Sequence, residues 1–396
     1  MEHVGKSAII LPPENGDWGL AAKRLAGVPL LTRILLSVER AGVNHVTICA
    51  GEAAPRLQRL VAGYPLQSDL RWTGDSEVDL TQALRQNGTS PCFIIPASTV
   101  LNPATLTEMK AAFHPGATLQ ANGEQGPECP VVLRSPTLPP TSESSTEEMD
   151  LSGNAVCLDL TTATAGEATT ALYRALGKPT DSRMIRWTRL RLSPLMRWIA
   201  NTPLTPNHIT LLGFLTGLLA IGSLWTGVYP WTVAGGVLFV VAHLIDHLDG
   251  MMARLKFQET RWGAWMDYTL DNVVHVGIFA AITRAVYLTQ PEQTVLALGV
   301  LLIAGAVTSA SIVAAHMNQL RRPGHRLLKH LMHRDFSLIV LLAALFDRLD
   351  WFLWAAAVGV NLFWPFLLYL LNREKTRATS MGVKQVDLYG SRISEG

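Results

Sequence analysis

The chain has 396 residues, of which 48% are hydrophobic and only 16% are charged, against roughly 25% charged residues in an average soluble protein. This composition excludes a disordered protein and a coiled coil. The formal net charge of +2 provides no global basic field, which argues against nucleic acid as a partner.

Residues 1–175 alternate short apolar runs with polar and Gly/Pro segments, as expected of a cytoplasmic α/β domain. Strands are predicted at 7–11, 45–51 and 92–98, and an amphipathic helix at 28–43. This strand–helix–strand spacing predicts a parallel sheet of Rossmann-like type. Residues 139–150 are expected to form an exposed loop. The four cysteines make no disulfide framework and fit a reduced, cytosolic front half, and no signal peptide is expected at the N-terminus.

The stretch 26–51 is similar to nucleotidyltransferases of the sugar-phosphate and inositol-phosphate kind. Those enzymes follow the first strand with a Gly-rich loop that holds a triphosphate, whereas residues 12–24 here read PPENGDWGLAAKR. Lys23 or Arg24 could replace the phosphate-binding Lys of that family. Its metal-binding Asp is replaced by Pro-Ala-Ser at 96–98. We interpret residues 1–175 as a degenerate nucleotidyltransferase-like domain, with a working CTP-dependent cytidylyltransferase as the alternative.

Within residues 176–203, Arg is mixed with Trp, Leu and Met, which predicts an interfacial juxtamembrane helix. A soluble linker helix packed on the front domain is the alternative. Long apolar segments follow, each suited to crossing a bilayer core of about 30 Å. They lie at 208–226, 230–252, 264–288, 294–317, 332–347 and 351–371.

Residues 204–375 are therefore expected to form an all-α domain of six transmembrane helices, followed by a polar, disordered tail at 376–396. Asp347, Arg348 and Asp350 make the fifth span the shortest. Basic residues gather on one side, which places the N-terminal domain, the active site and the C-terminus of this multi-pass cell or inner membrane protein in the cytoplasm. They are Arg183, Arg186, Arg189, Arg191, Arg197, Arg254, Lys256, Arg261, Arg321, Arg322, Arg326, Lys329, Arg334, Arg373, Lys375 and Arg377.

Two pairs of aspartates lie where the second and third spans meet the cytoplasmic side. Asp246 and Asp249 are three residues apart, and Asp267 and Asp271 four apart, so each pair shares one helix face. The turn between the spans is short, so the two pairs can face each other. Because an Asp near a helix centre costs about 2.5–3.5 kcal/mol in a membrane, bound cations are expected. Oxygen ligands favour Mg²⁺ or Mn²⁺ over zinc, and two such ions can clamp a diphosphate.

Small residues accompany the aspartates: Gly250, Ala253 and Gly263 would permit close approach by a ligand or by a neighbouring helix. His243 and His247 are spaced i, i+4, which offers zinc as an alternative. We interpret them instead as histidines that pack or support the site, because successive helix positions diverge by about 100°.

The stretch 246–271 resembles the signature of the CDP-alcohol phosphotransferase family, D-x2-D-G-x2-A-R-x8-G-x3-D-x3-D, at every fixed position. These positions are Asp246, Asp249, Gly250, Ala253, Arg254, Gly263, Asp267 and Asp271. The resemblance implies a six-span membrane enzyme with two divalent metals that joins a second alcohol's hydroxyl to the β-phosphorus of a CDP-alcohol and releases CMP. It also implies a homodimer.

Carried over by position, Asp246, Asp249 and Asp267 would bind metal, and Asp271 would bind metal or act as general base. The resemblance assigns the small residues and Arg254 to the cytidine nucleotide. Residues 176–210 look like the lead-in of fusions of inositol-phosphate cytidylyltransferase with di-myo-inositol-phosphate-phosphate synthase. There, Asn207 could face the nucleotide phosphates or cap the first span.

The densest basic patch, residues 321–335, has two interpretations: a pocket for a phosphorylated or headgroup-like acceptor, or ordinary positive-inside bias. Its candidate phosphate-binding residues are Arg334, Arg321, Arg322 and Lys329. Arg334 with Asp335 resembles an Arg-Asp pair of the fused enzymes, so Arg334 is the first choice.

The sequence thus predicts an integral-membrane CDP-alcohol phosphotransferase of phospholipid or polar-headgroup biosynthesis. CDP-diacylglycerol and CDP-inositol both fit as donor, and the acceptor is an alcohol or phosphorylated alcohol, with membrane lipid as a partner. One alternative is a bifunctional enzyme whose front half also makes the CDP-alcohol from CTP. Another is a membrane scaffold that keeps the fold without turnover.

Overall fold

The computed structural model describes residues 5–13, 16–73, 91–114, 117–122, 130–134, 146–151, 154–176, 194–316 and 336–390. The chain divides into two compact units. The N-terminal unit comprises Met1–Thr205 and takes in Met251–Gln258, and the membrane unit comprises Pro206–Gly250 and Glu259–Gly396.

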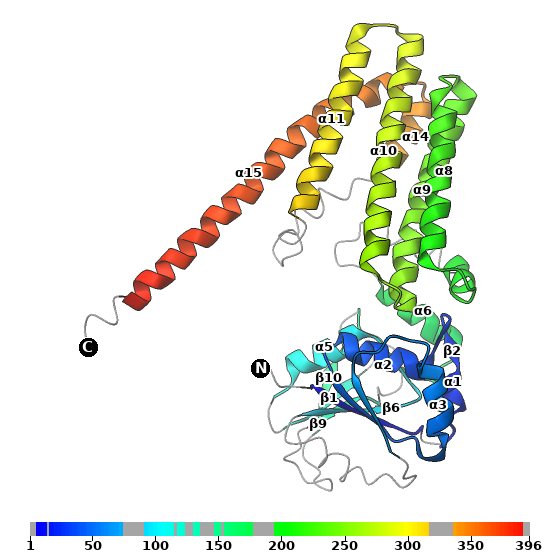
Figure 1. The fold of residues 1–396 in the computed structure, drawn as a ribbon, viewed down its shortest axis with the longest axis vertical. Helices are drawn as coiled ribbons and strands as arrows, with labels where there is room; N and C mark the ends of the chain where they lie inside the picture. Colours follow the sequence, from blue (N-terminus) through cyan, green and yellow to red (C-terminus); the bar gives the residue numbers. More distant parts are fainter. Residues whose placement is uncertain are drawn as a thin grey trace. The chain divides into compact units, whose positions relative to one another are not determined.

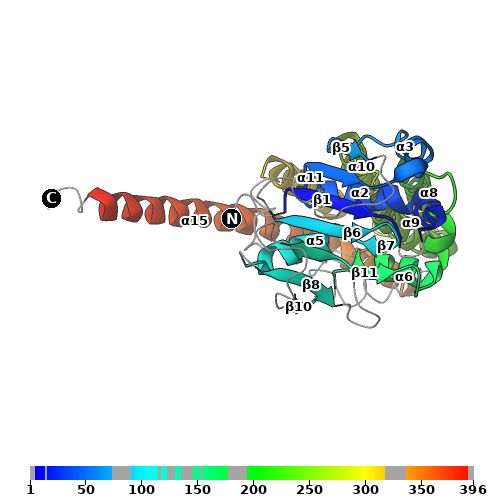
Figure 2. The same cartoon turned by 90° about the horizontal axis from the view of Figure 1, so that it is seen from below.

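A seven-stranded sheet with the order β10-β8-β9-β6-β1-β4-β5 organises the N-terminal unit. Strands β6, β1, β4 and β5 are parallel to one another, β9 is antiparallel to β6 and β8, and β10 is parallel to β8. Figure 2 shows β1 alongside β6. The strands are β1 (Ser7–Leu11), β4 (His45–Ile48), β5 (Asp69–Trp72), β6 (Cys92–Pro96), β8 (Thr118–Asn122), β9 (Val132–Arg134) and β10 (Thr146–Asp150).

The apolar run of β1 explains its central place, because parallel strands are covered on both faces and read as continuous hydrophobic segments. Ala8, Ile9 and Ile10 are fully buried. Helix α2 lies over the sheet (Figure 1). The helices are α1 (Gly19–Ala22), α2 (Leu30–Arg40), α3 (Ala54–Val61), α5 (Pro103–Ala112) and α6 (Ala165–Ala175), and the short strands are β2 (Arg24–Leu25), β3 (Val28–Pro29), β7 (Thr99–Leu101) and β11 (Cys157–Asp159).

The strands predicted at 7–11, 45–51 and 92–98 and the helix predicted at 28–43 are confirmed as β1, β4, β6 and α2. Two other expectations for the front half are wrong. The loop expected at 139–150 contains β10, because Thr146–Asp150 pairs with β8. The cysteines are not uniformly reduced: Cys49 and Cys92 are free thiols, whereas Cys157 is disulfide-bonded.

The membrane unit contains five helices that are long and apolar enough to cross a bilayer, counted over the described residues. The fifth predicted span, 332–347, falls on α14, of which nine residues are described, and residues 317–335 before it lie outside the described part. The helices are α8 (Pro206–Trp225), α9 (Tyr229–Lys256), α10 (Arg261–Thr289), α11 (Gln293–Ala315), α14 (Ser337–Leu345) and α15 (Leu349–Gly390).

Small residues let these helices pack closely. A Cβ on Gly217 of α8 would lie 2.7 Å from Val274 Cγ2 of α10, and one on Gly277 of α10 would clash with Ile221 Cδ1 of α8. Because lipid tails are as apolar as Leu, such close contacts drive helix association in membranes. One buried cluster includes Leu224, Ile282 and Leu302 and holds α8, α10 and α11 together.

The structure bears on two further predictions, the disordered C-terminal tail and the juxtamembrane helix. Helix α15 continues to Gly390, so the tail expected to be disordered from residue 376 begins as helix. The described part of the juxtamembrane segment, residues 194–200, is helical and buries Met196 and Ala200 while Leu195 and Trp198 are 42% and 67% exposed. Its one-sided burial and the bond from Arg197 to Thr170 Oγ1 agree with packing on the front domain, and its exposed apolar side chains agree with an interfacial helix.

Candidate functional site

The acidic residues predicted from spacing come together between α9 and α10. Residues 257–260 connect the two helices, which brings the ends of α9 and α10 close to each other. Asp246 and Asp249 of α9 and Asp267 of α10 each offer a carboxylate oxygen within 4.8 Å of the other two. The helix period and the short turn therefore produce the clustering that the sequence predicts.

Asp249 is the most deeply placed of the three, with 4% of its surface exposed. The hydroxyl of Thr210, on α8, donates a hydrogen bond to Asp249 Oδ2. Asp267 Oδ1 is buried without a hydrogen-bond partner within the described part of the chain. A buried oxygen left in this condition is costly unless a ligand completes it.

Asp271 lies next to this cluster rather than within the 4.8 Å group found among the described residues. Together with Asp246 and Asp267 it lines a small cavity of about 30 Å³. It also lines a second cavity of about 960 Å³. Asp271 therefore borders both the acidic cluster and a much larger space.

The larger cavity is open on one side, is lined by residues of α10, α11, α14 and α15, and has mostly apolar walls, including Leu302, Phe352 and Phe363. Polar groups from α10 enter it as well, among them His275. His275 Nδ1 lies 3.4 Å from Asp271 Oδ2, one helical turn away. A space of this size is typical of sites for organic ligands, and its walls favour an apolar portion of the ligand.

The residues assigned to the nucleotide flank the acidic cluster. Gly263 lies in the first turn of α10, and its backbone N–H donates to the Thr260 hydroxyl at 2.9 Å, which caps the helix. A Cβ on Gly263 would lie 3.3 Å from Asn207 Oδ1, so Asn207 of α8 faces this turn. Gly250 and Ala253 lie in the last two turns of α9, and both are partly buried.

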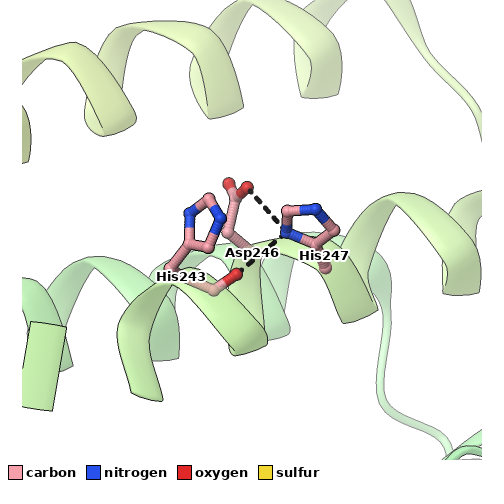
Figure 3. Close-up of side chains that lie close together, drawn as sticks. All are labelled: His243, Asp246 and His247. Atoms are coloured by element: carbon pink, nitrogen blue, oxygen red, sulfur yellow. Dashed lines mark hydrogen bonds and ion pairs between the residues drawn. The ribbon is translucent and has the colours of Figure 1, made fainter. Parts of the chain in front are cut away.

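His243, Asp246 and His247 project from one stretch of α9 (Figure 3). Their ligand atoms lie within 4.8 Å of one another. His247 Nδ1 is 3.0 Å from the His243 carbonyl oxygen and 3.9 Å from Asp246 Oδ2, and the two rings are 4.7 Å apart. Since Nδ1 of His247 is engaged with the backbone, this arrangement agrees with histidines that support Asp246.

The basic acceptor candidates Arg321, Arg322, Lys329 and Arg334 lie outside the described residues. Arg254 is partly buried, in the last turn of α9. Sequence reasoning missed Thr210 and His275. For His275, the i, i+4 spacing from Asp271 was an available signal, whereas Thr210 approaches Asp249 from another helix and gives no local signal.

The cluster fits a hard divalent cation. Its donors are carboxylate oxygens, they converge within 4.8 Å, and one of them, Asp267 Oδ1, is a buried oxygen with no hydrogen-bond partner in the described part. Oxygen ligands of this kind suit Mg²⁺ and Mn²⁺.

Apolar spans around a carboxylate-lined site define this half of the chain as a multi-pass membrane protein domain. Residues 203–365 match the family model described as CDP-alcohol phosphatidyltransferase. The membrane part of this chain is therefore similar to the CDP-alcohol phosphatidyltransferase family, which confirms the resemblance drawn from the eight signature positions.

Three relatives illustrate the similarity. The chain is 34% identical over 143 residues to inner membrane protein YnjF of Escherichia coli, covering 34% of this chain and 66% of that protein. It is 35% identical over 78 residues to the bifunctional IPC transferase and DIPP synthase of Aquifex aeolicus (20% and 17% covered). It is 31% identical over 116 residues to the phosphatidylinositol phosphate synthase of Cutibacterium acnes (28% and 51% covered). The chain thus spans between about a sixth and just under two thirds of the length of these relatives.

Proposed function

We propose that the chain is an integral-membrane CDP-alcohol phosphotransferase that moves a phospho-alcohol group from a CDP-alcohol to the hydroxyl of a second alcohol and releases CMP. The observation that carries this proposal is the position of Asp271, which borders both the acidic cluster and the 960 Å³ apolar cavity. A reacting diphosphate at the cluster and an organic group in the cavity would meet at this carboxylate.

Asp246, Asp249 and Asp267 would hold two divalent ions, Mg²⁺ or Mn²⁺, with Asp271 as a further ligand or as the base. Bound ions of this kind neutralise the diphosphate and stabilise the attacking and leaving oxygens. The Thr210 hydroxyl orients the Asp249 carboxylate through their hydrogen bond. The cation would also offset the repulsion between the clustered carboxylates.

Asp271 has the role of general base in this proposal. Its carboxylate takes the proton of the acceptor hydroxyl while the hydroxyl oxygen forms a bond to the β-phosphorus of the donor. The bond between that phosphorus and the bridging oxygen breaks, and CMP leaves with the electron pair. His275, 3.4 Å from Asp271 Oδ2, would keep the carboxylate oriented toward the acceptor.

The nucleotide would lie against the ends of α9 and α10. Gly250, Ala253 and Gly263 leave space beside the aspartates, and Arg254 and Asn207 would contact the cytidine nucleotide. The contact of Asn207 with Gly263 supports this placement, because a side chain on Gly263 would press on the amide.

The apolar cavity favours a lipid portion on one substrate, and CDP-diacylglycerol is therefore the proposed donor class, with CDP-inositol as the alternative. The similarity to proteins named phosphatidylinositol phosphate synthase and archaetidylinositol phosphate synthase, the latter 29% identical over 91 residues, supports a phosphorylated polyol as acceptor. Arg334, with Arg321, Arg322 and Lys329, would hold the acceptor's phosphate, since guanidinium groups bind phosphate in a fork geometry.

The front half is proposed to be a Rossmann-like, nucleotidyltransferase-like domain that no longer catalyses transfer. In support, Pro96 ends β6 and is followed by Ala97 and Ser98, both fully buried, so no carboxylate is available there for a metal. The similarity to the bifunctional IPC transferase and DIPP synthase favours the alternative of a working cytidylyltransferase. Full-length Asp271→Asn protein incubated with CTP and inositol phosphate separates the two, because pyrophosphate release supports the alternative.

The proposed organisation keeps residues 1–175 as the front domain, 176–203 as the juxtamembrane helix, 204–375 as a six-span membrane domain and 376–396 as a polar tail. The protein is proposed to form a homodimer in the membrane, with the front domain, the site and the C-terminus in the cytoplasm. The basic residues gathered in the loops that flank the site support this orientation.

The function is tested by CMP release from CDP-diacylglycerol by the purified protein in nanodiscs, with polyol phosphates offered as acceptors. The Asp271→Asn variant is expected to lose about 10²- to 10⁴-fold of the rate, the usual contribution of a general base. Asp347→Asn is the matched control, because Asp347 is exposed at the turn before α15 and Asn tolerates its positive φ of 53°. Equal lipid profiles in cells with wild-type protein and with Asp271→Asn would instead support a silent scaffold.

A further inference from the structure

The turn after α9 is held by the front half of the chain. The N-terminal unit takes in Met251–Gln258, so the last turns of α9 and Phe257 pack within that unit. The last carbonyls of a helix need partners from outside it. Arg33 of α2 supplies one: its Nη2 donates to the Leu255 carbonyl oxygen at 2.9 Å and to the Leu25 carbonyl oxygen at 2.8 Å.

Arg33 is built into the interior of this unit, with 2% of its surface exposed. Burial lowers the pKa of Arg33 to about 10, so the side chain remains a cation at neutral pH. A buried cation is costly unless it is hydrogen-bonded. The two bonds to carbonyl oxygens therefore stabilise the buried guanidinium. The contact with Leu255 crosses 222 residues of sequence, so local structure does not require it.

The backbone at this turn has the form of a helix-ending Schellman motif. The N–H of Gln258 donates to the Ala253 carbonyl at 2.8 Å, and the N–H of Phe257 donates to the Arg254 carbonyl at 3.3 Å. The position occupied by Phe257 usually carries Gly, because its φ is positive, here 58°. A bulky residue in this conformation needs compensation from its surroundings.

That compensation comes from α2. The guanidinium carbon of Arg33 lies 5.2 Å from the centroid of the Phe257 ring, and that of Arg40 lies 4.6 Å from it. Two cations on one ring stabilise the aromatic side chain where it is. The contacts of the ring with α2 therefore offset the cost of a positive φ at Phe257, a conformation that favours Gly.

The same turn also binds the lead-in to the first span. Lys256 Nζ donates to the Thr202 carbonyl at 2.8 Å and to the Leu204 carbonyl at 2.9 Å. Residues 206–225 then form α8, which carries Asn207 and Thr210. The chain therefore fixes the end of α9 and the approach to α8 at one place within the N-terminal unit.

We propose that Arg33 is a positioning residue for the divalent-metal site: by holding the C-terminal end of α9 it sets the position of Asp249 and Asp246. This inference rests on the proposed function, since it assigns Arg33 a role toward that same site. Leu255 follows Asp249 by six residues, about 9 Å along a stiff helix, so a shift of the helix end moves the carboxylates. Misplacement of an active-site group by about 1 Å can lower the reaction rate about 10²-fold.

The test measures Mn²⁺ binding to the purified full-length protein by electron paramagnetic resonance, with the metal alone as probe. Arg33→Met keeps most of the side-chain volume and removes both hydrogen bonds, and its Mn²⁺ dissociation constant is expected to rise about tenfold or more. Arg33→Lys, which can still donate, is expected to give an intermediate value. Arg24→Met is the matched control and should bind within about twofold of wild type, because Arg24 is exposed and, among the described residues, its side chain donates to the nearby Gly27 carbonyl.

A merely structural role would reduce the amount of folded protein without changing the dissociation constant of the remainder. Should Arg33→Met fail to fold, Phe257→Leu removes the stacked ring and is expected to weaken Mn²⁺ binding in the same direction. Wild-type affinity in the folded Arg33 and Phe257 variants would overturn the inference and leave the proposed function standing. Absence of Mn²⁺ binding by the wild-type protein, or binding unaffected by Asp249→Asn, would instead remove the metal centre on which both rest.

Discussion

Thr210 connects two helices of the site, since it lies on α8 and donates its hydroxyl hydrogen to Asp249 on α9. Both side chains are buried, with 8% and 4% of their surfaces exposed. A hydrogen bond from a neutral donor fixes the orientation of a metal-binding carboxylate and leaves its negative charge available to the metal ion. Loss of such a supporting bond typically costs 10- to 100-fold in metal affinity or activity.

Thr210→Val is therefore expected to raise the Mg²⁺ concentration for half-maximal CMP release by about 10- to 100-fold, since it removes only the hydroxyl. Thr216→Val provides the comparison on the same helix, because the Thr216 hydroxyl bonds to the Leu212 carbonyl of its own helix. Its Mg²⁺ requirement should match that of wild type. An unchanged requirement in Thr210→Val would show that Asp249 is oriented by other contacts.

Among individual residues, sequence spacing is sufficient to predict the clustered aspartates and insufficient to predict their partners. Asp246, Asp249 and Asp267 converge because a helix repeats every 3.6 residues and the connecting turn is short. The contact of Thr210 with Asp249 spans 39 residues and depends on how α8 packs, which no local pattern encodes. The same holds for Asp271, whose place beside the large cavity depends on α14 and α15.

Helix α8 packs on α10 through glycine, and the two glycines at 217 and 222 have different surroundings. A Cβ at Gly217 would approach Val274 Cγ2 to 2.7 Å, whereas one at Gly222 meets no described atom within 4 Å outside its own helix. The first position is a helix contact and the second faces open space. The difference allows a comparison within one helix.

Gly217→Ala is expected to destabilise the membrane unit by about 1–3 kcal/mol, the usual cost of overpacking, whereas Gly222→Ala should be neutral or slightly stabilising. Both changes improve helix propensity equally, so the difference between them reports the clash with Val274. Thermal unfolding of the two variants in detergent micelles measures it. Coincident unfolding temperatures would show that α8 moves away from α10 at little cost.

Helices and strands with strong hydrophobic periodicity or long apolar runs are predictable from the sequence, and those that depend on distant pairing are not. The spans α8–α11 and the buried strands β1 and β6 follow directly from apolar patterns. Strand β10 reads TEEMD and forms only because it pairs with β8 at the edge of the sheet, so its polar residues predicted a loop. Helix α15 extends far past its apolar span, where hydropathy gives no signal.

The basic residues of the loops predict on which side of the membrane the front half lies, and they favour the cytoplasm. Glu259 can test this orientation, because it is exposed and directly follows Met251–Gln258, which packs with the front half.

The proposed orientation predicts that Glu259→Cys reacts with a membrane-impermeant maleimide only after the cells are permeabilised. Val228→Cys, in the exposed turn between α8 and α9 at the opposite end of these spans, should react in intact cells. Wild-type protein provides the background, which should be low because thiolates are the reactive species and burial raises the pKa of Cys92 to about 12 and that of Cys49 above its usual value. The reverse labelling pattern would place the site and the front half outside the cytoplasm, where cytosolic CDP-alcohols would not reach the aspartates.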